Sequence, residues 1–110
     1  MTILALVCLM TLTAATIGNG SKNVTTAGEA VPLVSDSKSV SEVTVQALES
    51  NTGSIFVGDS SVADGLGMEI PSLSSYTYRD LGRGTYYDLA DIYVDAAVDG
   101  EGVTFNYEIR

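Results

Sequence analysis

The chain has 110 residues, of which 45% are hydrophobic and 17% are charged, so we expect one folded domain rather than a disordered chain. Its formal net charge is −9, which argues against nucleic-acid binding because phosphate backbones are neutralised by basic surfaces. It has no histidine and one cysteine, Cys8, so the usual general base, the Ser and Cys triads and a thiolate zinc site within one chain are missing. We therefore expect that the protein is not an enzyme.

Residues 1–17 form an apolar run that we expect to be an arm or an extra strand. A secretory signal is disfavoured because the first base, Lys22, follows the run instead of preceding it. A membrane span is disfavoured because threonines interrupt a run already shorter than the roughly 20 residues that a helix needs. We expect the segment to attach the domain to a partner through Ile3, Leu4, Leu6, Val7, Leu9 and Met10.

The first strands are predicted in residues 30–57. Residues 30–34 form a short candidate strand, and Pro32 inside it indicates a sheet edge. Apolar and polar residues alternate over 43–47, and a polar, glycine-ended turn separates this run from an apolar run at 54–57. We expect these two runs to form a hairpin.

The middle of the chain is predicted to hold a surface loop and then several short strands. Residues 59–66 are rich in Ser, Asp and Gly, which is typical of a loop, and residues 67–70 lead out of it. Short strands are expected at 76–78 and 85–89, on either side of the glycine-containing loop 80–84.

The C-terminal strands have the clearest pattern. Residues 92–98 and 103–109 both alternate with period two, and Asp99-Gly100-Glu101-Gly102 joins them, so a second hairpin is expected. No interior segment sustains a helical period over three turns. The fold class is therefore predicted to be all-β: a single compact β-sandwich or jelly-roll-like domain over residues 18–110, preceded by the arm.

The acidic residues near the C-terminus are the main candidates for chemistry. They are Asp88, Asp91, Asp95, Asp99 and Glu101. A carboxylate pair among them could serve a glycosidase, or the group could bind calcium, although its spacing differs from an EF-hand loop. We expect them to be solvated turn residues, with no catalytic residue, cofactor site or metal site.

The tyrosines and loop arginines are candidates for an interface. Tyr76, Tyr78, Arg79 and Arg83 are selected because Tyr and Arg are enriched at protein–protein contacts. The alternatives are that the tyrosines are strand residues half in the core and that the arginines are solvated.

Part of the sequence is similar to a known family. Residues 43–47, 55–62, 91–95 and 100–103, within a region covering residues 23–109, resemble small virion proteins of tailed bacteriophages. The resemblance implies a structural role, and within it a capsid decoration or cement protein: a compact β-domain, often trimeric, that sits over capsomer junctions. The apolar first 17 residues depart from that pattern.

Three functional hypotheses follow. The first is a decoration protein on the capsid exterior, expected to bind the major capsid protein or another virion protein and to form a homo-oligomer, with a trimer favoured. The alternative is a neck, tail or fibre component with a receptor- or glycan-binding domain, for which Tyr76, Tyr78 and Tyr86 would form the platform. A third is a secreted calcium-binding surface domain. No cofactor, nucleic-acid partner or membrane partner is expected.

Overall fold

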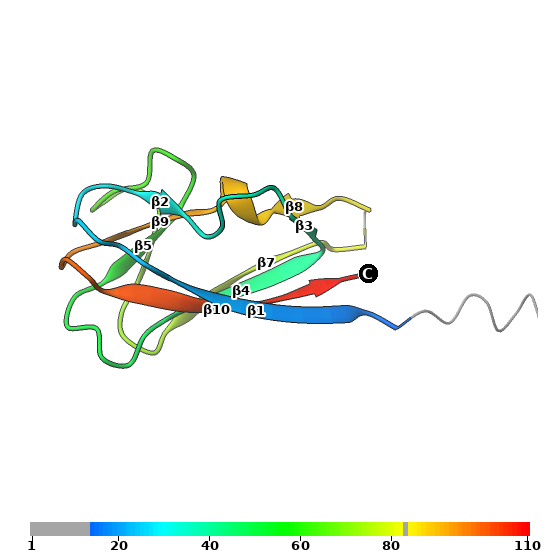
Figure 1. Ribbon diagram of the computed structural model, residues 1–110, viewed down its shortest axis with the longest axis horizontal. Coiled ribbons are helices and arrows are strands. Elements are labelled where there is room, and N and C mark those ends of the chain that lie inside the picture. The colour runs from blue at the N-terminus through cyan, green and yellow to red at the C-terminus, as the bar shows by residue number, and fades with distance from the viewer. Residues whose placement is uncertain (1–13, 83) are drawn as a thin grey trace, which may run out of the picture.

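The structure, a computed structural model, describes residues 14–82 and 84–110 and has an all-β fold over them (Figure 1). Its strands are β1 (Thr16–Asn23), β2 (Val31–Pro32), β3 (Ser39–Val40), β4 (Glu42–Ala47), β5 (Ile55–Gly58), β6 (Met68–Ile70), β7 (Ser75–Arg79), β8 (Tyr87–Asp88), β9 (Tyr93–Ala96) and β10 (Gly102–Ile109). One 3₁₀ turn, η1 (Leu89–Asp91), follows β8.

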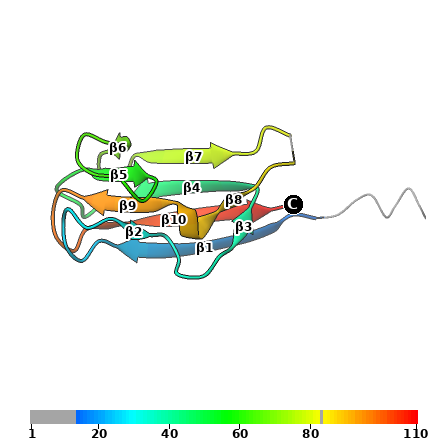
Figure 2. The same ribbon diagram turned by 90° about the horizontal axis from the view of Figure 1, so that it is seen from above.

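The strands form two packed sheets. Sheet A has the order β1-β10-β4-β7, and sheet B has the order β2-β9-β5-β6. A two-stranded ribbon, β3-β8, lies beside them at the end where the C-terminus is found (Figures 1 and 2). The predicted all-β sandwich is therefore confirmed.

The pairing pattern identifies the sandwich as a jelly roll. β1 pairs with β10, β2 with β9, β3 with β8, β4 with β7 and β5 with β6, and every pair is antiparallel. The chain is thus one long hairpin that folds back between β5 and β6. Rolling this hairpin up brings β4 beside β10 and β5 beside β9, which gives the two four-stranded sheets of a jelly roll.

Both predicted hairpins are wrong. The runs 43–47 and 54–57 became β4 in sheet A and β5 in sheet B, and the runs 92–98 and 103–109 became β9 in sheet B and β10 in sheet A. A glycine-rich link between alternating strands serves a hairpin and a crossing between sheets equally well. Here the 99–102 link bonds to Val24 instead, which donates to Glu101 O (2.8 Å) and accepts from Gly100 N (2.7 Å).

The core lies between the two sheets and follows the predicted alternation. Val103 and Phe105 of β10 are buried, and Phe105 is only 4% exposed. Thr104 and Asn106, on the opposite face of the same strand, are exposed. The half-buried register predicted for the last strand is confirmed.

Strand β1 was not predicted over its full length, because its sequence TIGNGSKN has little β-propensity. Gly18 and Gly20 lie opposite Tyr107 and Phe105 in the register with β10. A Cβ at Gly20 would lie 2.5 Å from Phe105 Cζ, and a Cβ at Gly18 would overlap the Tyr107 ring. The aromatic rings of β10 therefore cover the two glycines, an arrangement known to stabilise glycine on edge strands.

The remaining strand predictions were correct in type but differ in extent. Pro32 lies in β2 at the edge of sheet B, as predicted. The expected strand 85–89 is reduced to the two-residue β8, since η1 begins directly after it. β1 begins at Thr16, inside the segment 1–17 that was predicted to form an arm or an extra strand.

Candidate interaction surfaces

The outer face of sheet A carries a regular array of uncharged polar side chains. The strand register places these side chains in two rows, and each row crosses all four strands. The first row is Asn19, Asn106, Thr44 and Thr77, and the second is Ser21, Thr104, Gln46 and Ser75. We call these eight residues the polar face.

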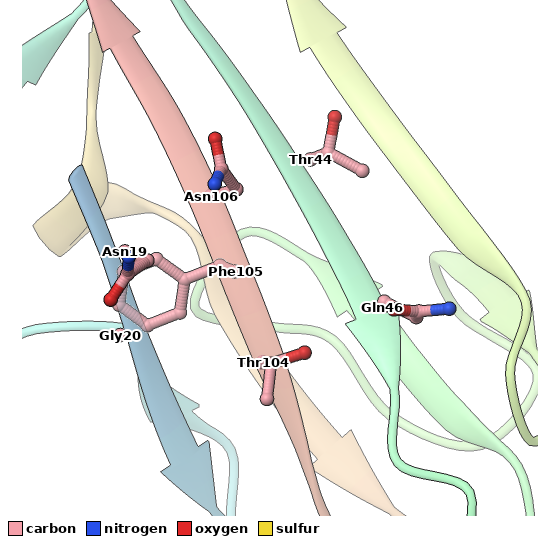
Figure 3. A pocket seen from close by; sticks show the side chains of 7 residues that line it. All are labelled: Asn19, Gly20, Thr44, Gln46, Thr104, Phe105 and Asn106. Atoms are coloured by element: carbon pink, nitrogen blue, oxygen red, sulfur yellow. The ribbon is translucent and has the colours of Figure 1, made fainter. Parts of the chain in front are cut away.

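A shallow hollow of about 310 Å³ lies over the polar face (Figure 3). It is lined by Asn19, Gly20, Thr44, Gln46, Thr104, Phe105 and Asn106.

Some side chains of the polar face bond within the chain and others do not. Thr44 Oγ1 and Thr77 Oγ1 form a 2.8 Å hydrogen bond, and Gln46 Nε2 donates to Leu73 O at 3.1 Å. Within residues 14–82 and 84–110, the side chains of Asn19, Thr104 and Asn106 make no hydrogen bond. All three side chains are exposed to solvent.

One end of sheet A is charged instead. Arg79 Nε lies 3.1 Å from Glu42 Oε1, Arg110 Nη2 lies 3.5 Å from the same oxygen, and Arg110 Nε lies 3.2 Å from Glu108 Oε1. Arg79, one of the interface candidates, therefore has an acidic neighbour in its own chain. Arg83, selected with it, lies outside the described residues.

Tyr76 and Tyr78, the two tyrosines that were interface candidates, pack against the core. Tyr76 and Tyr78 lie opposite Val45 and Val43 in the register, so they share the inner face of sheet A and pack against the core. Their ring centroids are 4.9 Å apart, and those of Tyr78 and Tyr87 are 5.6 Å apart. This placement fits the alternative that these tyrosines are half in the core, and their role in an interface stays a prediction.

A second hollow, of about 320 Å³, combines tyrosines with acids at the end of the sandwich near η1. It is lined by Gly58, Asp59, Tyr78, Tyr86, Tyr87, Asp88, Asp91 and Ile92, and we call it the tyrosine pocket. Burial, with smaller contributions from Tyr76, Tyr87 and Asp59, raises the pKa of Tyr78 above its ordinary value. Hydrogen bonds from Ser61 lower the pKa of Asp59, and Asp88 and Asp91 add two more carboxyl groups to the lining.

Asp88 fixes the start of η1 and the loop before β3. It accepts hydrogen bonds from Ser37 Oγ, from Lys38 N at 2.9 Å and from Ala90 N at 2.9 Å. These bonds, the one from Ser37 foremost, hold the pKa of Asp88 below its ordinary value. The carboxylate therefore has a local structural role.

Glu101 acts in the same way on the turn before β5. It accepts from Thr52 N at 2.6 Å, from Thr52 Oγ1 at 2.9 Å and from Gly53 N at 2.9 Å. The two backbone bonds are the main cause of the lowered pKa of Glu101. Glu101, which was expected to be a solvated turn residue, therefore accepts hydrogen bonds from residues that are distant in the sequence.

Asp95 and Asp99 hold the loop between β1 and β2. Asp99 accepts from Ala27 N at 2.7 Å, and Asp95 accepts from Gly28 N at 2.9 Å and from Ala96 N at 2.8 Å. Asp95 is 2% exposed, so the expectation that it is solvated is wrong: the loop covers it. Among the described residues there is no group of three or more His, Cys, Asp or Glu placed to hold a metal ion.

No family model, curated protein or solved structure significantly matches the chain. In the described part of the chain, no helix is long and apolar enough to span a membrane. The predicted attachment residues Ile3, Leu4, Leu6, Val7, Leu9 and Met10 lie outside the described residues.

The polar face was missed by sequence reasoning, although part of its signal was visible. The outward positions of the alternating runs at 43–47 and 103–109 include Thr44, Gln46, Thr104 and Asn106. The sequence did not indicate that these two runs are neighbouring strands. It also did not indicate that β1 extends the array, because the glycines of β1 lower its β-propensity.

Proposed function

We propose that this chain is a structural virion protein, a decoration or cement protein that binds the outside of a capsid lattice. The observation that carries the proposal is the exposed edge strand β1. The resemblance of residues 23–109 to small phage virion proteins supplies the class, and the jelly roll is an architecture used by viral capsid domains.

β1 is suited to pair with another chain. It lies at the end of sheet A, and in the described part of the chain no strand pairs with its outer edge. Its eight residues include no proline and one charged residue, Lys22, so it lacks most devices that protect natural edges. Strand addition at such an edge supplies main-chain hydrogen bonds to a partner.

The apolar N-terminal sequence joins the domain at the same strand. Thr16 lies opposite Ile109 at the start of β1, and Ile17 is 70% exposed. Burying large apolar side chains contributes roughly 1.5–3 kcal/mol each, so residues of this segment would add to attachment at the β1 edge. The partner is the major capsid protein or another virion protein.

The charge distribution supports an exterior position. β1 has no acidic residue, whereas the net charge of the chain is −9. Acids placed away from the attachment edge would keep a coated particle soluble, because like charges oppose association.

We further propose a homotrimer, with neither nucleic acid nor membrane as a partner.

The test is the copy number of the protein in purified particles, measured by quantitative mass spectrometry. A number comparable to that of the major capsid protein is expected. A few copies per particle would favour the neck, tail or fibre alternative, and absence from particles would overturn both.

A matched pair of variants tests the attachment edge. Ile17→Lys places a charge on β1 and should reduce the amount of protein retained on particles. Leu81→Lys alters an equally exposed apolar residue (72%) in a loop outside β1 and should leave retention unchanged. Equal retention of the two variants would show that β1 is not the attachment edge.

A further inference from the structure

We propose that the polar face of sheet A binds a neutral glycan chain. The inference does not depend on the protein being a decoration protein, because a sugar-binding face could serve a domain placed anywhere on a particle. It also differs from the tyrosine platform expected from the sequence, since Tyr76 and Tyr78 lie on the inner face of the sheet.

The polar face itself carries no charged side chain. The chain has 14 acidic and five basic residues, yet all eight positions of the polar face are Ser, Thr, Asn or Gln. The charged side chains of the same outer face, Glu108, Glu42 and Arg79, lie together in the adjoining row at one end of the sheet, so a ligand that lies along the polar face meets uncharged groups. A neutral face on an acidic protein suits a neutral ligand, whereas an anionic polymer would meet the net negative charge of the molecule.

The side chains of each row are spaced like the units of a sugar chain. Neighbouring strands lie about 4.7–4.9 Å apart, so a row that crosses four strands extends about 14 Å. The distance between neighbouring strands is close to the length of one pyranose unit. Each row could therefore follow several consecutive sugars. The shallow hollow of about 310 Å³ lies along the part of both rows that crosses β1, β10 and β4 (Figure 3).

The side chains of the polar face have the hydrogen-bonding chemistry that sugars require. Sugar hydroxyls donate and accept, and amide and hydroxyl side chains do both as well. Asn19, Thr104 and Asn106 have no side-chain hydrogen bond within the described residues, and Asn106 lies between Asn19 and Thr44 in the register. The tyrosine pocket differs, because its carboxylates favour a cationic group over a neutral one.

Binding can be mapped by NMR with the intact ¹⁵N-labelled protein and a panel of neutral hexasaccharides: cellohexaose, maltohexaose, laminarihexaose and chitohexaose. At least one should, at millimolar concentration, shift the side-chain amide signals of Asn19, Gln46 and Asn106. A hexasaccharide of heparin, which is acidic, should not produce these shifts. The absence of shifts with every neutral probe would overturn the proposal.

Variants separate this face from the tyrosine pocket. Asn106→Ala should weaken binding about 2- to 10-fold, as expected for one lost hydrogen bond, and Thr104→Ala with Asn106→Ala should weaken it further. Tyr86→Ala should leave the affinity unchanged. Shifts confined to the tyrosine pocket, or a loss of binding in Tyr86→Ala alone, would assign the sugar to the pocket and overturn the proposal.

Discussion

The outer faces of the two sheets differ in how they are covered. The outer face of sheet A is open and bears the polar face over strands of up to eight residues. The outer face of sheet B, whose strands have two to four residues, is covered by loops. Phe56 and Asp95 lie opposite each other there and are both buried.

The two sheets are held in place by different interactions. In sheet A, long ladders of backbone hydrogen bonds fix the strands, and few side-chain bonds, such as that between Thr44 and Thr77, cross the outer face. In sheet B, the strands are too short to define the surface by themselves. Carboxylates such as Asp95 and Asp99 bond to loop amides, and these bonds hold the covering loop in place.

The largest loss of stability is expected in sheet A, for Phe105→Ala on the buried face of β10. The change leaves a cavity between the sheets and beside Gly20, and should cost about 3–5 kcal/mol. Thr104→Ala, on the polar face, should cost far less. Urea midpoints of the two variants check this; comparable losses would mean that the outer face of sheet A is also structural.

Gly20→Ala should be the next most damaging change. The added Cβ would meet the Phe105 ring at 2.5 Å, and displacing a packed ring typically costs about 1–3 kcal/mol. Ser21→Ala, at a neighbouring exposed position of β1, is the control and should be nearly neutral. Thermal unfolding of both variants measures the difference, and a neutral Gly20→Ala would show that the ring does not need to lie over the glycine.

In sheet B, Asp95→Ala should destabilise the protein by about 1–3 kcal/mol, because it leaves the Gly28 amide without its partner. The loss should be local, so hydrogen exchange at Gly28 should accelerate more than exchange in sheet A. Asp91→Ala, at an exposed position of η1, is the control. Unchanged exchange at Gly28 would contradict the proposed role of the carboxylate.

Acid should weaken the carboxylate-held loops. The pKa values of Asp88 and Glu101 are lower in the folded protein than their ordinary values. Their contribution is therefore fully present above about pH 5, since unfolded Asp and Glu titrate near 4, and is lost as the pH falls through the folded pKa values. The melting temperature should fall below about pH 4, and the fall should be smaller in Glu101→Gln. An identical acid profile for that variant would exclude Glu101.

The smallest effect is expected at the charged end of sheet A. Arg79 and Glu42 are solvent-exposed and partly exposed, respectively, so Arg79→Ala should cost no more than about 1 kcal/mol. High salt should reduce the difference from the parent protein further. A larger loss in urea unfolding would show that this ion pair matters more than its exposure suggests.

The fold class could be predicted because alternation directly records which face of a strand is buried. Val103, Phe105 and their neighbours gave the correct register for β10. The connections could not be predicted, because the turn at 99–102 has the same composition whether it joins strands of one sheet or crosses to the other.

The roles of individual site residues depended on contacts between distant positions. Glu101 binds the amides of Thr52 and Gly53, and Asp95 binds Gly28, and no local pattern marks such pairs. Gly20 by itself indicates an interruption of a strand, and its place in β1 is explained only by Phe105, which lies opposite it. The polar face needed the order of four strands, which only the rolled topology provides.

The rolled topology also sets an order for folding during synthesis. β10 lies between β1 and β4 in sheet A, so β1 has no neighbour in that sheet until β10 has left the ribosome. Until then, β1 and β4 each expose an edge that β10 will occupy, and exposed edges invite pairing with other chains. Pairing across nearly the whole chain is also slow to form. A nascent chain arrested before β10 should therefore be aggregation-prone, and completing β10 should release it into the native fold.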